Sequence, residues 1–131
     1  MTDKQVIKLL DKYRQAPDDI ELAIEKIEQW QDIDGAVAAG EVERLKKRVV
    51  ELQKLIVSVE RAVEKLPKSQ RDIIRLRGEG TSWWGVAQII RYSVRSCQMN
   101  YGKALRVLAN SKELMKYASE IESGDIDSVR G

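Results

Sequence analysis

Seven polar or basic residues in the last third of the chain have side chains suited to binding DNA. Arginine, glutamine and asparagine form hydrogen bonds with base edges, and lysine and arginine also bind phosphates. Their spacing would bring most of them onto the outer faces of one helix that begins after Ser93. The candidate DNA-binding residues are Arg91, Arg95, Ser96, Gln98, Asn100, Lys103 and Arg106.

The order of these residues along the expected helix indicates two roles. Arg95, Gln98 and Asn100 are the side-chain types that reach base edges. Lys103 and Arg106 lie farther along the helix and are suited to phosphates. The alternative is that this is only a solvated basic face.

Two short helices around a three-residue turn are predicted to position these side chains. Gly78 and Gly80 interrupt the chain, and Ser82 can then accept hydrogen bonds from the amides at the start of a new helix. Residues 91–93 form the predicted turn. Ser93 caps the second helix, and Arg91 is suited to binding a phosphate. Such a helix-turn-helix can place its second helix in the major groove of DNA.

Apolar residues at helical spacing predict the faces on which these helices pack. Val86, Ala87 and Ile90 share one face of the first helix, and the small Ala87 would let the two helices cross closely. Because Cys97 falls on the inward face of the second helix, we interpret it as a core residue rather than a reactive thiol. The other inward residues of this helix are Tyr101, Ala104, Leu105 and Leu108.

Three residues in this segment need separate interpretations. Trp83 is expected in the core, whereas the adjacent Trp84 cannot face the same way. The alternatives for Trp84 are the DNA backbone, RNA polymerase or the N-terminal helices. Gly102 costs about 1 kcal/mol relative to alanine inside a helix, so its missing side chain is expected to permit close approach to DNA or to a neighbouring helix.

The net charge of +2 hides an uneven distribution along the chain. Residues 1–65 hold 12 basic and 14 acidic side chains, and residues 111–131 hold 3 and 5. Residues 66–110 hold 8 basic and 2 acidic side chains. The excess positive charge therefore coincides with the predicted helix pair, as expected where a polyanion binds.

A longer motif includes both helices and the segment before them. Its elements are Leu66-Pro67, Ile73-Ile74-Arg75-Leu76, Ser82-Trp83, Val86-Ala87, Tyr92-Ser93, Arg95, Cys97 and Ala104-Leu105. The pattern covers about residues 42 to 109 and resembles region 4 of bacterial sigma factors. It resembles still more closely the phage regulators of the RinA and ArpU type. This resemblance implies a regulator of phage late genes with a sigma-like helix-turn-helix. The chain departs from that family at Trp84 and Gly85, where acidic residues are usual.

The first forty residues are predicted to form two helices. Thr2 and Gln5 have the spacing of a capping box before the first helix. Pro17 suits the first position of the second helix. The small residues at 36–40 are expected to form a hinge.

A long helix is predicted over residues 41–66, with an apolar heptad repeat that we call the seam. Its β-branched residues at a positions and leucines at most d positions favour a parallel two-stranded coiled coil. A dimer would also present two second helices to paired half-sites on DNA. The alternative is that the seam packs within one chain against the first two helices. The seam residues predicted to dimerise are Val42, Leu45, Val49, Leu52, Ile56, Val59 and Val63.

Proline at position 67 is expected to end the long helix, because the residue before a proline avoids helical geometry. Ser69 is predicted to cap a short helix that supports the other two. Its arginines, Arg71, Arg75 and Arg77, are expected to touch phosphate or polymerase, or else to be solvated or paired locally.

The predicted fold class is all-α, in three parts. Residues 1–66 form a helical oligomerisation region, residues 67–109 the DNA-binding domain, and residues 110–131 a short helix and a polar tail. With no histidine, one cysteine and no phosphate-binding glycine loop, we expect no enzyme activity, cofactor or metal site. Without a long apolar run or a signal peptide, the expected location is the cytoplasm of a bacterial host.

These observations predict a homodimeric, sequence-specific activator of phage or prophage late transcription that binds double-stranded DNA. A small terminase-like packaging factor is one alternative, because such proteins also join a helix-turn-helix to helical oligomerisation. The other alternative is an adaptor that holds host RNA polymerase without touching DNA.

Overall fold

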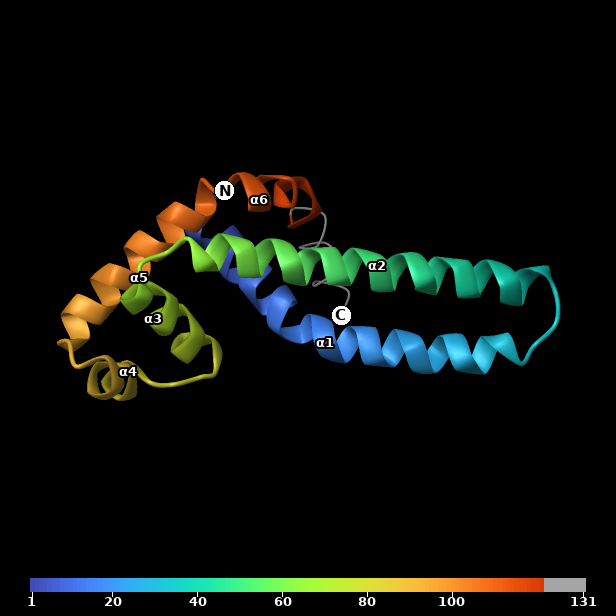
Figure 1. Ribbon diagram of the computed structural model, residues 1–131, viewed down its shortest axis with the longest axis horizontal. Coiled ribbons are helices and arrows are strands. Elements are labelled where there is room, and N and C mark those ends of the chain that lie inside the picture. The colour runs from blue at the N-terminus through green and yellow to red at the C-terminus, as the bar shows by residue number, and fades with distance from the viewer. Residues whose placement is uncertain (122–131) are drawn as a thin grey trace. The chain divides into compact units, whose positions relative to one another are not determined.

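The computed structural model describes residues 1–121, which fold into helices joined by short turns and contain no strand (Figure 1). The all-α fold class is therefore confirmed for this part of the chain. The predicted polar tail lies outside the described residues. The helices are α1 (Asp3–Gln31), α2 (Ala36–Glu64), α3 (Lys68–Gly78), α4 (Trp83–Ile90), α5 (Val94–Ala109) and α6 (Lys112–Met115).

The chain divides into two compact units. One unit, residues 12–57, is a hairpin in which most of α1 and most of α2 pack against each other. The other unit combines residues 1–11 with the described chain from Ser58 onward, and contains α3 to α6.

A single helix, α1, occupies the region where two were predicted. Pro17 lies inside it rather than at the start of a second helix. A proline inside a helix costs about 3 kcal/mol. The ring of Pro17 is exposed, while Ala16 and Ala23 on either side of it are buried at helical spacing, so the buried face of α1 continues past the proline. The predicted capping box is confirmed. The backbone amide of Gln5 donates to Thr2 Oγ1 at 3.2 Å, and the backbone amide of Thr2 donates to Gln5 Oε1 at 2.8 Å.

No hinge is found at residues 36–40, because α2 already begins at Ala36. The Ala39 amide donates to the carbonyl of Gly35 at 3.1 Å, and Ala38 is buried. Alanine is the best helix former, and these alanines extend the helix backwards to the turn. Gly35, with φ of 120°, supplies the conformation that reverses the chain.

Part of the seam is buried within the single chain. Four of its positions, Val42, Leu45, Leu52 and Val59, are buried there, as the intrachain alternative requires. The remaining positions, Val49, Ile56 and Val63, are half-buried. The apolar face of α2 is wider than the seam alone, since Leu55 and Ala62 are also buried.

The helix α3 begins directly after the proline, so the prediction that Ser69 caps it is wrong. Pro67 occupies the N-cap position without a side-chain cap, and its carbonyl accepts the first helical hydrogen bond, from the Arg71 amide at 3.0 Å. Ser69 lies inside the first turn and is half-buried. The fixed φ of proline, here −55°, is compatible with a helix start and replaces the serine cap.

Helices α3, α4 and α5 pack on one another in every pairwise combination. Their shared core contains Ile73, Val86, Ala87 and Cys97. The half-buried side chains around that core are Leu76, Trp83, Ile90, Val94 and Tyr101. This core holds α5 by one face and leaves its opposite face outward.

The N-terminus and α6 belong to the same compact unit as α3, α4 and α5. The terminal amine of Met1 donates to the carbonyl of Ala109 at 3.2 Å. Tyr117 Oη donates to Ser58 Oγ at 3.4 Å, and Lys65 forms an ion pair with Glu113. None of the described helices has both the length and the apolar character needed to cross a membrane.

Candidate nucleic-acid interface

The turn between α4 and α5 has the local structure that its sequence predicts. Ser82 Oγ accepts a hydrogen bond from the Gly85 amide at 3.1 Å, and Ser93 Oγ accepts one from the Ser96 amide at 3.0 Å. Arg91 adopts a left-handed conformation with φ of 65°, and its amide donates to the carbonyl of Ala87 at 2.9 Å. Both predicted N-caps and the turn over residues 91–93 are therefore confirmed.

The inward face of α5 is also the one that its sequence predicts. Tyr101 is half-buried, and the other predicted inward residues, Cys97, Ala104, Leu105 and Leu108, are buried. Burial raises the pKa of the Cys97 thiol. The neutral, enclosed thiol supports the interpretation of Cys97 as a core residue.

The candidate DNA-binding residues differ in how they are presented. Arg91, Arg95, Gln98, Lys103 and Arg106 are exposed. Ser96 and Asn100 are half-buried, and Asn100 Nδ2 donates to the carbonyl of Ser96 at 2.9 Å. The Asn100 amide is thus engaged with its own helix backbone.

Helical geometry separates the exposed candidates on α5 into three directions. With about 100° per residue, Arg95 and Arg106 lie within about 20° of each other around α5, directly away from the core. Gln98 lies about 60° from Arg95, toward the edge of the buried face. The two arginines therefore share the outer face, although about 16 Å of helix axis separates them. Lys103 lies about 80° from Arg95 on one side of that face, and Gln98 lies at the opposite margin.

Two further residues lie on this outer face: Met99, for which the sequence predicted no role, and Gly102, for which close approach to DNA was one of two expectations. Met99 is 54% exposed and lies between Arg95 and Lys103 at four-residue spacing. Gly102 follows one turn later, and Arg106 Nη2 lies 3.4 Å from the point that a Cβ of Gly102 would occupy. A helical projection of the sequence, centred opposite the predicted core, could have indicated Met99 as well.

The tryptophan pair has one structural and one exposed member. Trp83 is half-buried and lies edge-on to Tyr101, with ring centres 5.3 Å apart. The Arg77 guanidinium lies 4.4 Å from the centre of the Trp83 ring, and its Nη1 donates to the carbonyl of Thr81 at 2.9 Å. Trp84 is 70% exposed. Arg77 is therefore engaged in holding the start of α4, which differs from the predicted contact with phosphate or polymerase.

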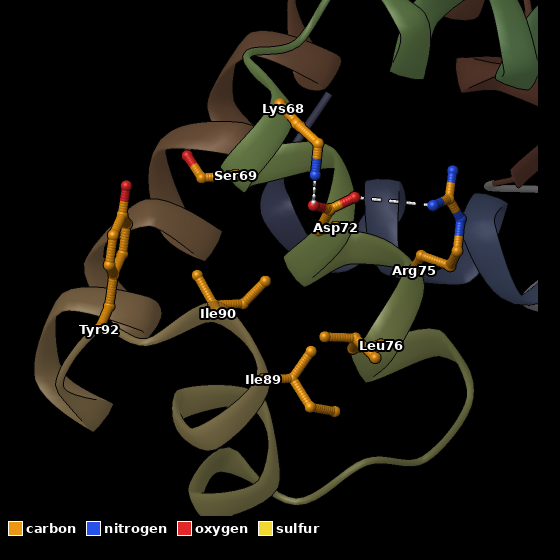
Figure 2. Close-up of a pocket in the computed structure, with 8 residues that line it drawn as sticks. All are labelled: Lys68, Ser69, Asp72, Arg75, Leu76, Ile89, Ile90 and Tyr92. Carbon is orange, nitrogen blue, oxygen red and sulfur yellow. Dashed lines mark hydrogen bonds and ion pairs between the residues drawn. The ribbon is translucent and has the colours of Figure 1, made fainter.

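A groove of about 670 Å³ lies between α3 and the end of α4 (Figure 2). On the α3 side, Asp72 pairs with Lys68 at 2.9 Å and with Arg75 at 3.6 Å. The local pairing predicted as an alternative for Arg75 is thus present. On the other side lie Ile89, which is 60% exposed, and Tyr92. The groove combines an apolar wall with a charged one.

The described residues contain no cluster of three or more acidic, cysteine or histidine side chains able to hold a metal ion. Comparisons with protein-family models, with curated proteins and with solved structures found no significant match.

Proposed function

We propose that this protein is a sequence-specific DNA-binding regulator of transcription, in which α4 and α5 act as a sigma region 4-like helix-turn-helix. One observation carries the proposal. The helix α5 is held by its buried face against α3 and α4, and its opposite face presents Arg95, Lys103 and Arg106. A capped, supported and basic helix of this kind fits the major groove of DNA.

The charge distribution supports the same proposal. Residues 66–110 hold 8 basic and 2 acidic side chains, and the two acidic ones are Asp72 and Glu79. Asp72 lies on α3 and is paired there with Lys68 and Arg75. The outer face of α5 therefore remains positive, which favours association with a polyanion.

The proposed roles follow the position of each side chain. Arg95, near the start of α5, contacts a base edge, with Gln98 at the margin of the same surface. Lys103 and Arg91 bind phosphates on either side. From the resemblance of the sequence to the RinA and ArpU type, we propose that this activity serves phage or prophage late genes and that its outcome is activation.

We also propose that the protein binds as a homodimer, because two copies of α5 could then contact paired half-sites. The half-buried seam positions Val49, Ile56 and Val63 are where the seam still offers apolar surface to a second chain. The four buried positions of the seam are not part of that surface.

The test is a selection of bound duplexes from a random-sequence pool, followed by binding measurements on the selected site. The double variant Arg95→Ala, Gln98→Ala should keep its helicity and melting temperature, because both side chains are exposed. It should lose the preference for the selected site, since one base contact contributes about 1–3 kcal/mol of discrimination.

The matched control is Arg48→Ala, Gln53→Ala, which removes the same two side-chain types from exposed positions of α2. This control should keep full preference. Retained preference in the α5 double variant would mean that another face contacts the bases. If wild-type protein selects no duplex at low salt, the proposal fails entirely.

A second candidate function is an adaptor that holds RNA polymerase. The exposed Ile89 and Tyr92 beside the groove favour it, because large exposed apolar side chains near a groove are typical of protein-binding surfaces. An adaptor would retain polymerase in a pull-down and lose it in Ile89→Asp, while shifting no DNA fragment at low salt.

A further inference from the structure

The outer face of α5 has an apolar centre. Met99 is 54% exposed, although its neighbours at four-residue spacing, Arg95 and Lys103, are both cations. The long methyl-thioether of methionine adapts to irregular apolar surfaces. An apolar side chain in the middle of a cationic face indicates that the face contacts an apolar group as well as charges.

Gly102 adjoins Met99 on this face, and the fold does not require a glycine there. Its φ is not in the left-handed region. Among the described residues, Arg106 Nη2, at 3.4 Å, is the one heavy atom near the position of a Cβ, apart from the helix's own backbone. Within residues 1–121, no neighbouring helix approaches within 4 Å of that position. Glycine nevertheless weakens a helix relative to alanine. The effect of Gly102 is to leave room beside the backbone on the outer side, at a half-buried position that the Arg106 guanidinium borders.

The Arg106 side chain lies beside this position. Its guanidinium extends back along the helix to Gly102, which lies about one turn before Arg106 and is therefore closer to Met99. This places a hydrogen-bond donor at Gly102, within one helical turn of the apolar Met99. A phosphate contact by Arg106 would not require this arrangement.

In the major groove, thymine is the base that presents a methyl group, and O4 next to it is a hydrogen-bond acceptor. We propose that Met99 packs on the C5 methyl of a thymine and that Gly102 leaves room for this contact, with the Arg106 guanidinium beside it. The inference rests on the proposed function and names the base that the outer face of α5 recognises.

The experiment replaces each thymine of the selected duplex, one at a time, with deoxyuridine, which lacks only the methyl group. At one position in each half-site, wild-type affinity should fall about fourfold, as expected for one buried methyl group. Met99→Ala should bind the thymine duplex about as weakly as wild type binds the deoxyuridine duplex. The same variant should be insensitive to deoxyuridine at that position.

Met115→Ala is the matched control, because Met115 is 51% exposed and lies on α6. It should keep both the affinity and the sensitivity of the wild type. Gly102→Ala is the second variant, and its new methyl would be in ordinary contact with Arg106. It should melt no lower than wild type and still bind the thymine duplex more weakly, which a purely structural glycine would not do.

The outcomes separate this inference from the proposed function. Sequence-specific binding with no position at which Met99→Ala removes the deoxyuridine effect would overturn the inference alone. A selected site without thymine would do the same. Failure of the wild type to bind any duplex would overturn both the inference and the function on which it rests.

Discussion

At the scale of single residues, Ser93 fixes where α5 begins. Its Oγ accepts the Ser96 amide at 3.0 Å, and its carbonyl accepts the Cys97 amide at 2.9 Å. These two bonds hold the first turn of α5, in which Arg95 lies. A serine cap of this kind typically contributes about 1 kcal/mol to stability.

Ser93→Ala should therefore lower the free energy of unfolding by about 1 kcal/mol, measured by urea denaturation. Ser69→Ala serves as the control, because Ser69 lies inside α3 and caps no helix. Equal losses in the two variants would contradict the assignment of Ser93 as the cap.

A second prediction at the residue scale concerns pH. Lys65 donates to the carboxylate of Glu113, and the Glu113 backbone and Ser111 add further hydrogen bonds. Together they lower the pKa of Glu113 from its ordinary value of 4.5 to about 2. Because the folded-state pKa is the lower one, this stabilisation is complete above about pH 4.5 and is lost as the pH falls through about 2.

Glu113→Gln should accordingly lower the melting temperature above pH 5 and flatten its fall between about pH 4.5 and 2, as followed by circular dichroism. The effect should be small, because the pair is solvent-exposed and screened. Glu60→Gln, another exposed glutamate, should keep the wild-type pH profile. Identical profiles for both variants would refute the role of Glu113.

At the scale of helices, two glycines inside helices have opposite surroundings. A Cβ on Gly85 in α4 would lie 2.9 Å from Thr81 Cγ2 and 3.3 Å from Ser82 Oγ, the oxygen that caps the helix. A Cβ on Gly102 would lie 3.4 Å from the end of the flexible Arg106 side chain. The first glycine is required by packing, and the second is not.

We expect Gly85→Ala to lower the free energy of unfolding by about 1–3 kcal/mol through overpacking. Gly102→Ala should raise it by up to about 1 kcal/mol, because alanine is the better helix former. Chemical denaturation of the two variants under the same conditions measures both. A stabilised Gly85→Ala would show that Thr81 moves aside without cost.

At the scale of the whole molecule, one part of the apolar face of α2 is buried within the chain. The other part is the surface proposed to pair with a second copy. Leu52 is buried within the single chain, whereas Val50 on the same helix is exposed. The contribution of Leu52 to stability should therefore not depend on a second copy.

Leu52→Ala should lower the free energy of unfolding by about 2–5 kcal/mol, and by the same amount over a wide range of protein concentration. Val50→Ala should have little effect. If the loss in Leu52→Ala shrank as the protein was diluted, Leu52 would instead lie between two chains. Thermal melts at several concentrations distinguish the two cases.

The sequence alone determined the local features of the candidate site. The caps at Ser82 and Ser93, the turn over residues 91–93 and the inward face of α5 depend on residues within one or two helical turns. The physical chemistry of such short segments is largely independent of the rest of the chain. For that reason these predictions are confirmed, and the DNA contacts built on them stay predictions.

Tertiary structure decided which apolar surfaces are covered and where long side chains lie. Pro17 stays inside α1, whose buried face continues past it, and four seam positions are buried because apolar surface within the same chain covers them. Lys65 pairs with Glu113, and Tyr117 donates to Ser58, in rotamers that no periodicity specifies, because these partners lie far apart in the sequence. In each case several contacts of similar free energy compete. The one that forms depends on which surfaces the folded chain brings together.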